Sequence, residues 1–134
     1  MLAQAVRFAI ATRATTMRAP LTIYHNPACT KSRETLALIR ERGHEPQIVE
    51  YLKTPPSEAE LTAIVRKLGI KPLELVRTGE QVFKDKYKGK TLSDKEWIKA
   101  MVADPILIQR PIVVRGDAAA IGRPPQDIER LLKP

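Results

Sequence analysis

The chain lacks the features that mark several common protein classes. It has one cysteine, Cys29, among 134 residues, so it can form no internal disulfide. None of its apolar runs is long enough to span a bilayer, and it has no glycine-rich loop of the nucleotide-binding type. With only His25 and His44 and no ligand cluster around them, it predicts no metal site. A protein without disulfides or membrane spans is expected to be cytoplasmic, with no membrane partner.

Aromatic residues are also scarce. The chain has one Trp, three Tyr and two Phe, too few for a platform on which bases could stack. The net charge is +8 and the pI is about 9.9, which fits either a nucleic acid or a small anionic substrate. The most basic segment, residues 84–90, alternates lysine with other residues, and we expect a solvated loop there. We therefore predict an anionic small molecule as partner and no nucleic acid.

The first 19 residues differ in composition from the rest. They contain Arg7, Arg13 and Arg18, many Ala and Thr, and no acidic residue. An interrupted apolar run argues against a secretory signal, whereas a basic, acid-free segment has some transit-peptide character. A simpler alternative is that Met17 is the true start. We expect residues 1–19 to be a disordered N-terminal extension and residues 20–134 to form a single domain.

The rest of the chain alternates strand and helix patterns. Residues 21–24 and 46–52 read as strands flanking a helix over 30–42, which makes a parallel βαβ unit. Two capping-box patterns and two apolar stripes predict that about 57–104 is all helical. Residues 112–114 and 118–121 then read as a hairpin, and a last helix follows two prolines. The order βαβ, helical block, ββα predicts an α/β fold with an inserted helical subdomain.

Cys29 lies where the first strand gives way to the first helix. Unpaired N–H groups and the helix dipole favour an anion at such a junction, which lowers a thiol pKa and also binds oxyanions. No acidic residue occurs between positions 21 and 33, and Lys31 and Arg33 follow closely. The alternative is that Cys29 is a small buried hydrophobe. Its polar neighbours, Asn26 and Ser32 among them, favour a reactive thiol.

Three motifs together resemble a known family. They are His25-Asn26-Pro27-Ala28-Cys29 followed by Ser32-Arg33, then Arg110-Pro111-Ile112-Val113-Val114, then Gly122-Arg123-Pro124-Pro125. This pattern resembles the glutaredoxin-coupled arsenate reductases over about residues 20–133. The resemblance implies a thioredoxin-like fold with a helical insertion, in agreement with the element order above.

The resemblance also assigns roles to residues. It implies that Cys29 is the nucleophile and that three arginines bind the anion: Arg77, Arg110 and Arg123. Guanidinium groups suit this role, because their planar fork matches the oxygens of a tetrahedral oxyanion. Supporting positions implied by the resemblance are His25, Asn26, Ser32 and Pro111. Pro111 is expected to follow a cis peptide bond and face Cys29, and His25 to tune the thiol or orient its loop.

The implied reaction needs thiols from outside the chain. The Cys29 thiolate would attack arsenate, glutathione would act as co-substrate, and glutaredoxin would restore the thiol, with no bound cofactor. A single cysteine is compatible with that sequence of steps, since the other thiols are external.

Other functions remain open at this stage. Well-known members of the family carry Gly-Thr after the cysteine, whereas this chain has Thr30-Lys31, which puts the substrate in question. One alternative is a glutathione-dependent monothiol oxidoreductase acting on another substrate, because a fold does not fix a substrate. A second is a redox regulator that binds RNA polymerase. Such regulators use a Cys-x-x-Cys switch, and Ser32 stands at the second position here.

Overall fold

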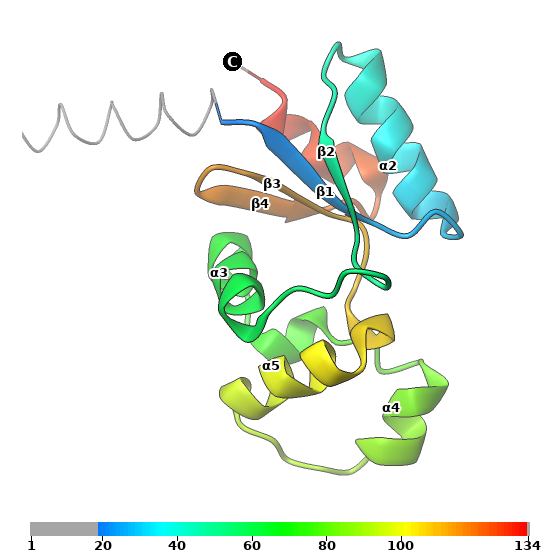
Figure 1. Ribbon diagram of the computed structural model, residues 1–134, viewed down its shortest axis with the longest axis vertical. Helices are drawn as coiled ribbons and strands as arrows, with labels where there is room; N and C mark the ends of the chain where they lie inside the picture. The colour runs from blue at the N-terminus through cyan, green and yellow to red at the C-terminus, as the bar shows by residue number, and fades with distance from the viewer. Residues whose placement is uncertain (1–18, 134) are drawn as a thin grey trace, which may run out of the picture.

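A four-stranded mixed sheet organises the chain, and the computed structural model describes residues 19–133 (Figure 1). The strands are β1 (Leu21–His25), β2 (Gln47–Glu50), β3 (Ile112–Arg115) and β4 (Ala118–Ile121), in the order β2-β1-β3-β4. β1 pairs in parallel with β2, whereas β1–β3 and β3–β4 are antiparallel. The predicted βαβ unit and C-terminal hairpin are therefore both confirmed.

The two faces of the sheet belong to two apolar cores. Ile23, Val113 and Ala120 face a cluster completed by α2 (Thr30–Glu41) and the 3-10 helix η3 (Pro125–Leu131). These two helices pack together along that face. Because side chains alternate along a strand, the neighbouring residues of β1, β3 and β4 point to the opposite face. That face meets the helical block.

The helical block occupies the end of the molecule away from α2 (Figure 1). Its elements are α3 (Glu58–Leu68), η1 (Pro72–Leu75), α4 (Gln81–Lys86), α5 (Asp94–Ala103) and η2 (Pro105–Leu107). The hydroxyl groups of Ser57 and Ser93 cap α3 and α5 by accepting hydrogen bonds from the backbone N–H groups of Glu60 and Glu96. The predicted insertion over about 57–104 is thus helical, with η2 continuing it.

One backbone contact ties this block to the strand that follows it. Val76 and Ile108 form an isolated antiparallel bridge. The N–H of Arg77 donates to the carbonyl of Leu107 at 2.7 Å, and the N–H of Gln109 donates to the carbonyl of Leu75 at 2.9 Å. This pairing places Arg77 alongside the segment that leads into Arg110.

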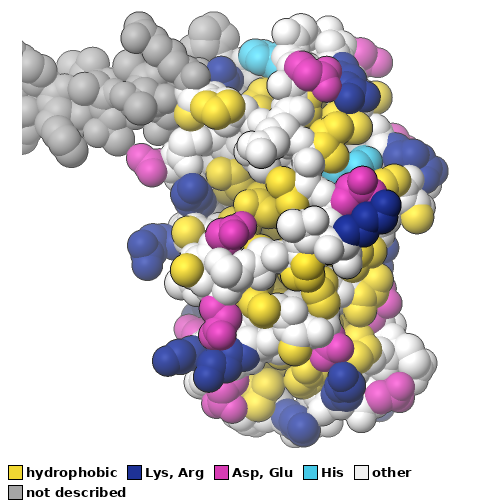
Figure 2. All heavy atoms as spheres, viewed as in Figure 1, with side chains coloured by type: hydrophobic (Ala, Val, Ile, Leu, Met, Phe, Trp, Pro, Cys, Tyr) yellow, Lys and Arg dark blue, Asp and Glu magenta, His cyan; other side chains and the backbone are white. Residues whose placement is uncertain are grey.

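Some boundaries differ from the sequence-based expectation. The basic segment was expected to be a solvated loop, but Lys84 and Lys86 lie on α4, because Phe83 and Tyr87 contact Trp97 with ring centroids 6.0 Å away. β2 ends at Glu50 instead of position 52, and η1 and η3 are 3-10 helices. Basic side chains are scattered among acidic and apolar ones on the face shown in Figure 2.

The predicted extension lies almost entirely outside the described residues. Ala19 is described, and its carbonyl accepts a hydrogen bond of 2.9 Å from Arg115 Nε. Within residues 19–133 no helix is long and apolar enough to cross a membrane. The same range holds no group of three or more His, Cys, Asp or Glu side chains that could share a metal ion.

Candidate active site

Cys29 is the N-cap residue of α2. Its backbone is extended, with φ −95° and ψ 124°, and its N–H donates to the carbonyl of Asn26 at 2.9 Å. The Asn26 side chain closes the same turn by accepting the N–H of Ala28 at 3.0 Å. Cys29 makes no side-chain capping bond of the Ser or Asp type. Its sulfur is therefore left facing the first turn of the helix, partly exposed.

The thiol of Cys29 is acidified by its surroundings. Burial raises its pKa, but hydrogen bonds from the Ser32 N–H and from the Arg110 side chain lower it. The positive charge of Arg110 and the N–H of Lys31 lower it further, and the net pKa is below the ordinary 9.0. The start of a helix and the Arg110 guanidinium thus favour the thiolate form of Cys29 relative to an ordinary cysteine.

Ser32 connects the loop before the cysteine to the helix after it. Its Oγ accepts the N–H of Asn26 at 3.0 Å and lies 2.6 Å from His25 Nδ1. All three residues are buried. Because the hydroxyl oxygen already accepts from Asn26, its own proton is available for Nδ1, which fits a neutral imidazole. Burial lowers the pKa of His25, the neutral form being favoured accordingly.

The structure therefore places His25 against Ser32 and not against the thiol. Of the two roles expected for His25, orientation of the loop fits this contact. The groups that lower the pKa of Cys29 are Ser32, Arg110 and Lys31, and His25 touches the first of them.

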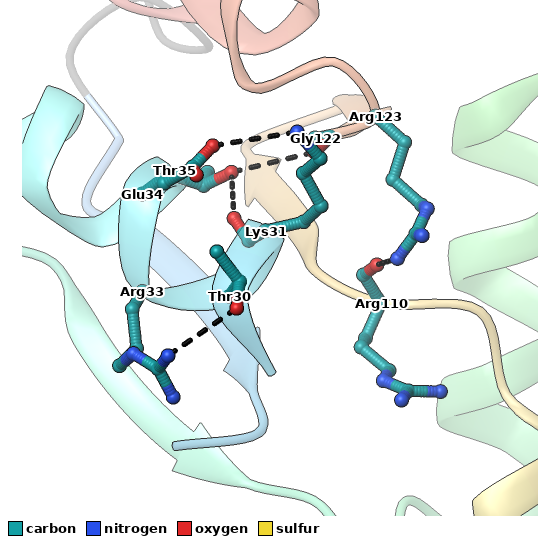
Figure 3. Close-up of polar contacts among 8 residues, drawn as sticks. All are labelled: Thr30, Lys31, Arg33, Glu34, Thr35, Arg110, Gly122 and Arg123. Carbon is teal, nitrogen blue, oxygen red and sulfur yellow. Dashed lines mark hydrogen bonds and ion pairs between the residues drawn. The ribbon is translucent and has the colours of Figure 1, made fainter. Parts of the chain in front are cut away.

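Arg110 and Arg123 meet through a hydrogen bond from one side chain to the other's backbone (Figure 3). Arg110 is largely buried, with 13% of its side chain exposed, and the peptide bond between it and Pro111 is cis, as predicted. Arg123 is exposed, and its Nη1 donates to the carbonyl of Arg110 at 3.2 Å. The bond that follows Arg123 is also cis. The two arginines, which are 13 positions apart in the sequence, thus share one site.

Arg77 joins this group through an acidic residue. Glu80 forms ion pairs with Arg77 Nη1 and with Arg110 Nη1, the latter at 3.9 Å. The other two anion-binding candidates, Arg77 and Arg123, are therefore both neighbours of Arg110. Sequence reasoning missed Glu80, although the turn Arg77-Thr78-Gly79-Glu80 is a recognisable signal, closed by the Glu80 N–H donating to the carbonyl of Arg77 at 3.2 Å.

Tyr51 is a second residue that the sequence did not reveal. It follows β2, is 1% exposed, and its hydroxyl has no hydrogen-bond partner among the described residues. Burial raises its pKa to about 12, while the charge of Arg110 opposes that shift. Tyr51 thus places a neutral hydroxyl within the electric field of Arg110. Its position at the end of an apparent strand gave no hint of this role.

The Thr30-Lys31 departure leaves the backbone unstrained. Thr30 begins α2 in helical conformation, and none of the described non-glycine residues has a positive φ. The Lys31 ammonium group lies 3.6 Å from Glu34, and both side chains are about half exposed (Figure 3). Lys31 therefore acts on the thiol through its backbone N–H.

A hollow of about 250 Å³ adjoins the cysteine loop. It is bounded by the loop residues from His25 to Ala28 and by Glu50, Leu52 and Lys53. Leu52 is 42% exposed, and Pro27 and Ala28 are exposed as well. The loop that leads to Cys29 is therefore open to solvent on this side.

Comparisons with known proteins agree with this geometry. The model of the ArsC family matches residues 24–131. A protein of Escherichia coli K12 described as "Uncharacterized protein YfgD" is 46% identical over 108 residues, 79% of this chain and 91% of its own. An arsenate reductase of Haemophilus influenzae is 45% identical over 112 residues, 82% of this chain and 97% of its own.

Solved structures give the same result for the fold. An arsenate reductase from Vibrio cholerae superposes with a TM-score of 0.81 at 42% identity, covering 84% of this chain and 98% of its own. The α/β fold of the chain is that of the thioredoxin-like arsenate reductases. On these grounds the chain belongs to the ArsC family.

Proposed function

We propose that this protein reduces arsenate to arsenite, with Cys29 as the nucleophile and with glutathione and glutaredoxin as the reducing partners. The observation that carries the proposal is the acidified Cys29 thiol at the start of α2, opposed by Arg110. Its relatives named arsenate reductases support the choice of substrate. Arg77, Arg110 and Arg123 would bind the oxygens of arsenate, because guanidinium groups pair with tetrahedral oxyanions at two points.

The reaction can be written with its electrons balanced. The Cys29 thiolate attacks arsenic(V), a sulfur–arsenic bond forms, and one oxygen leaves as water after protonation. The glutathione thiolate then attacks the Cys29 sulfur, and the sulfur–arsenic bond breaks with its electron pair going to arsenic, which leaves as arsenite. Cys29 and glutathione are now joined in a mixed disulfide. Glutaredoxin attacks the glutathione sulfur, and the Cys29 thiolate is restored.

The surroundings of Cys29 suit thiols that arrive from outside. The sulfur is partly exposed, and the hollow lined by Pro27, Ala28 and Leu52 gives a partner thiol a side of approach away from the arginines. When glutaredoxin attacks the mixed disulfide, Cys29 is the leaving group, and Arg110 would stabilise its departing thiolate, since a low pKa makes a better leaving group. Glutathione is abundant in reducing compartments, so we propose that the protein works in the cytoplasm.

The decisive experiment measures arsenate-dependent NADPH oxidation in the presence of glutathione, glutaredoxin and glutathione reductase. The wild-type protein should turn over, and Cys29→Ser, which keeps the size of the side chain, should show no turnover above background. A folded wild-type protein with a titratable thiol and no arsenate-dependent turnover would overturn the proposal. The assay should then be repeated with a glutathione mixed disulfide as substrate, which tests the alternative monothiol oxidoreductase.

A further inference from the structure

The arginines of the site already have an anion next to them, and it belongs to the protein. Glu80 forms ion pairs with Arg77 and Arg110, which lie 33 positions apart in the sequence. Its side chain is 27% exposed, and those of Arg77 and Arg110 are 23% and 13% exposed. A carboxylate between two largely buried guanidinium groups lowers the cost of burying their charge.

Two features of the backbone put Glu80 there. The turn of residues 77–80 brings Glu80 back over Arg77, and the pairing of Val76 with Ile108 brings Arg77 beside Arg110. Glu80 is also the N-cap residue of α4, yet its side chain makes no capping hydrogen bond. The carboxylate is therefore committed to the arginines and not to its own helix.

The Glu80 carboxylate balances the charge of Arg110 but leaves some of its buried N–H groups without a hydrogen-bond acceptor. Within residues 19–133, Arg110 Nε and Arg110 Nη1 are buried and have no hydrogen-bond acceptor, since Glu80 lies 3.9 Å from Nη1, beyond hydrogen-bond distance. Buried donors of this kind normally have partners. A tetrahedral oxyanion offers several acceptor oxygens in place of two, and charge-assisted bonds to it are the stronger kind. The site thus has donors that Glu80 leaves for another anion.

We propose that Glu80 is a built-in counter-ion of the anion site, which holds Arg77 and Arg110 in the free protein and must be displaced from them when an oxyanion binds. The displacement needs only a rotation of the Glu80 side chain, because this side chain is partly exposed and makes no capping hydrogen bond to α4. Only an anion that binds the arginines more strongly than Glu80 can then displace it. A tetrahedral dianion has more charge and more acceptor oxygens than Glu80, whereas a monoanionic carboxylate has no more than Glu80 itself. The inference rests on the proposed function only for the name of the oxyanion.

The test uses sulfate, an unreactive tetrahedral dianion, titrated into the full-length protein and followed by the amide signals of residues 30–32. Glu80→Gln removes the charge and should bind sulfate about 2- to 5-fold more tightly, the range expected for a partly exposed ion pair. Asp85→Asn is the matched control, since Asp85 lies on the same helix and its carboxylate accepts from Gln81 at 2.8 Å, away from the arginines. It should leave sulfate affinity unchanged.

Glu80→Asp provides an independent variant. It keeps the charge but shortens the side chain by one methylene, which draws the carboxylate away from Arg110, so its sulfate affinity should lie between those of the wild type and Glu80→Gln. If Glu80→Gln does not fold, Glu80→Asp decides alone. Sulfate affinity that is unchanged or weaker in the folded variants would overturn the inference. Because no turnover is measured, this result is separate from the question of arsenate reduction.

Discussion

The reactivity of Cys29 depends on a balance between burial, which raises the thiol pKa, and donors, which lower it. Two of those donors are backbone N–H groups at the start of the helix, which no substitution other than proline removes. Arg110 is the one side chain among the groups that lower the pKa, and it acts both by hydrogen bonding and by charge. Among single residues, Arg110 is therefore the one whose side chain can be changed to alter the pKa of Cys29.

Removal of Arg110 should shift the pH dependence of the thiol. The folded wild-type protein holds the Cys29 pKa below 9.0, so the rate of alkylation by iodoacetamide should rise with pH around a midpoint below that value. In Arg110→Ala the midpoint should move to higher pH, and the rate at pH 7 should fall, because less of the thiol is ionised. The rate is measured by mass spectrometry from pH 5 to 10.

Lys31→Ala is the control for that shift. Lys31 is adjacent in sequence and carries the same charge, but only its backbone N–H acts on the thiol. Its profile should match that of the wild type. Equal shifts in the two variants would mean that general positive charge, and not the Arg110 contact, sets the pKa.

Residues whose role follows from chain order could be predicted, and residues whose role follows from tertiary contact could not. Cys29 at its helix start and Ser32 one turn later were both placed correctly, since the strand-to-helix pattern fixes them locally. The grouping of Arg77, Arg110 and Arg123 rested on a resemblance. Tyr51 and Glu80 came from neither source, because what brings them to Arg110 is the packing of the helical block against the sheet.

Elements with their own start and stop signals were the predictable ones. Serine caps marked the starts of α3 and α5, and Asp104-Pro105 marked the end of α5. The glycines expected to end α2 and α3, Gly43 and Gly69, do adopt positive φ values of 84° and 70°. The sequence pattern did not predict a short helix that is stabilised by contacts with a neighbouring element. α4 exists through the contact of its aromatic residues with Trp97, which no local signal in a lysine-rich segment reveals.

The close approach of α2 to the end of β4 is an element-scale feature that a single substitution can test. A Cβ added at Gly122 would overlap Thr35 Oγ1 of α2 and lie 2.8 Å from Pro111 Cγ. Gly122→Ala must therefore push α2 away or move Pro111, and it should lower the free energy of unfolding by about 1–3 kcal/mol. Urea unfolding followed by circular dichroism measures the loss.

Gly79→Ala is the matched control for Gly122→Ala. A Cβ at Gly79 meets nothing within 4 Å, and Gly79 does not have a positive φ. The substitution should leave the free energy of unfolding unchanged or raise it by up to about 1 kcal/mol, by restricting the unfolded chain. Equal effects of the two substitutions would show that α2 and β4 are not in tight contact.

For the whole molecule, the relevant property is charge. The chain carries a net charge of +8, and both small molecules proposed to reach Cys29, arsenate and glutathione, are anions at neutral pH. The basic side chains on the visible face are dispersed and do not form a stripe of the kind that tracks a nucleic acid backbone (Figure 2). A dispersed positive charge instead raises the concentration of small anions near the whole surface.

The effect of this charge can be measured with two disulfide reagents that differ in charge. Ellman's reagent carries two carboxylates, whereas 4,4′-dithiodipyridine is neutral, and both report on the reaction of Cys29 by absorbance. Raising the salt from about 0.01 M to about 1 M shortens the Debye length from about 30 Å to about 3 Å. The rate with Ellman's reagent should fall about tenfold or more, because attraction to the positive protein is screened. The rate with the neutral reagent should change little. Parallel salt dependences for the two reagents would show that the net charge of +8 does not guide anions to Cys29, and the local arginines alone would then account for anion capture.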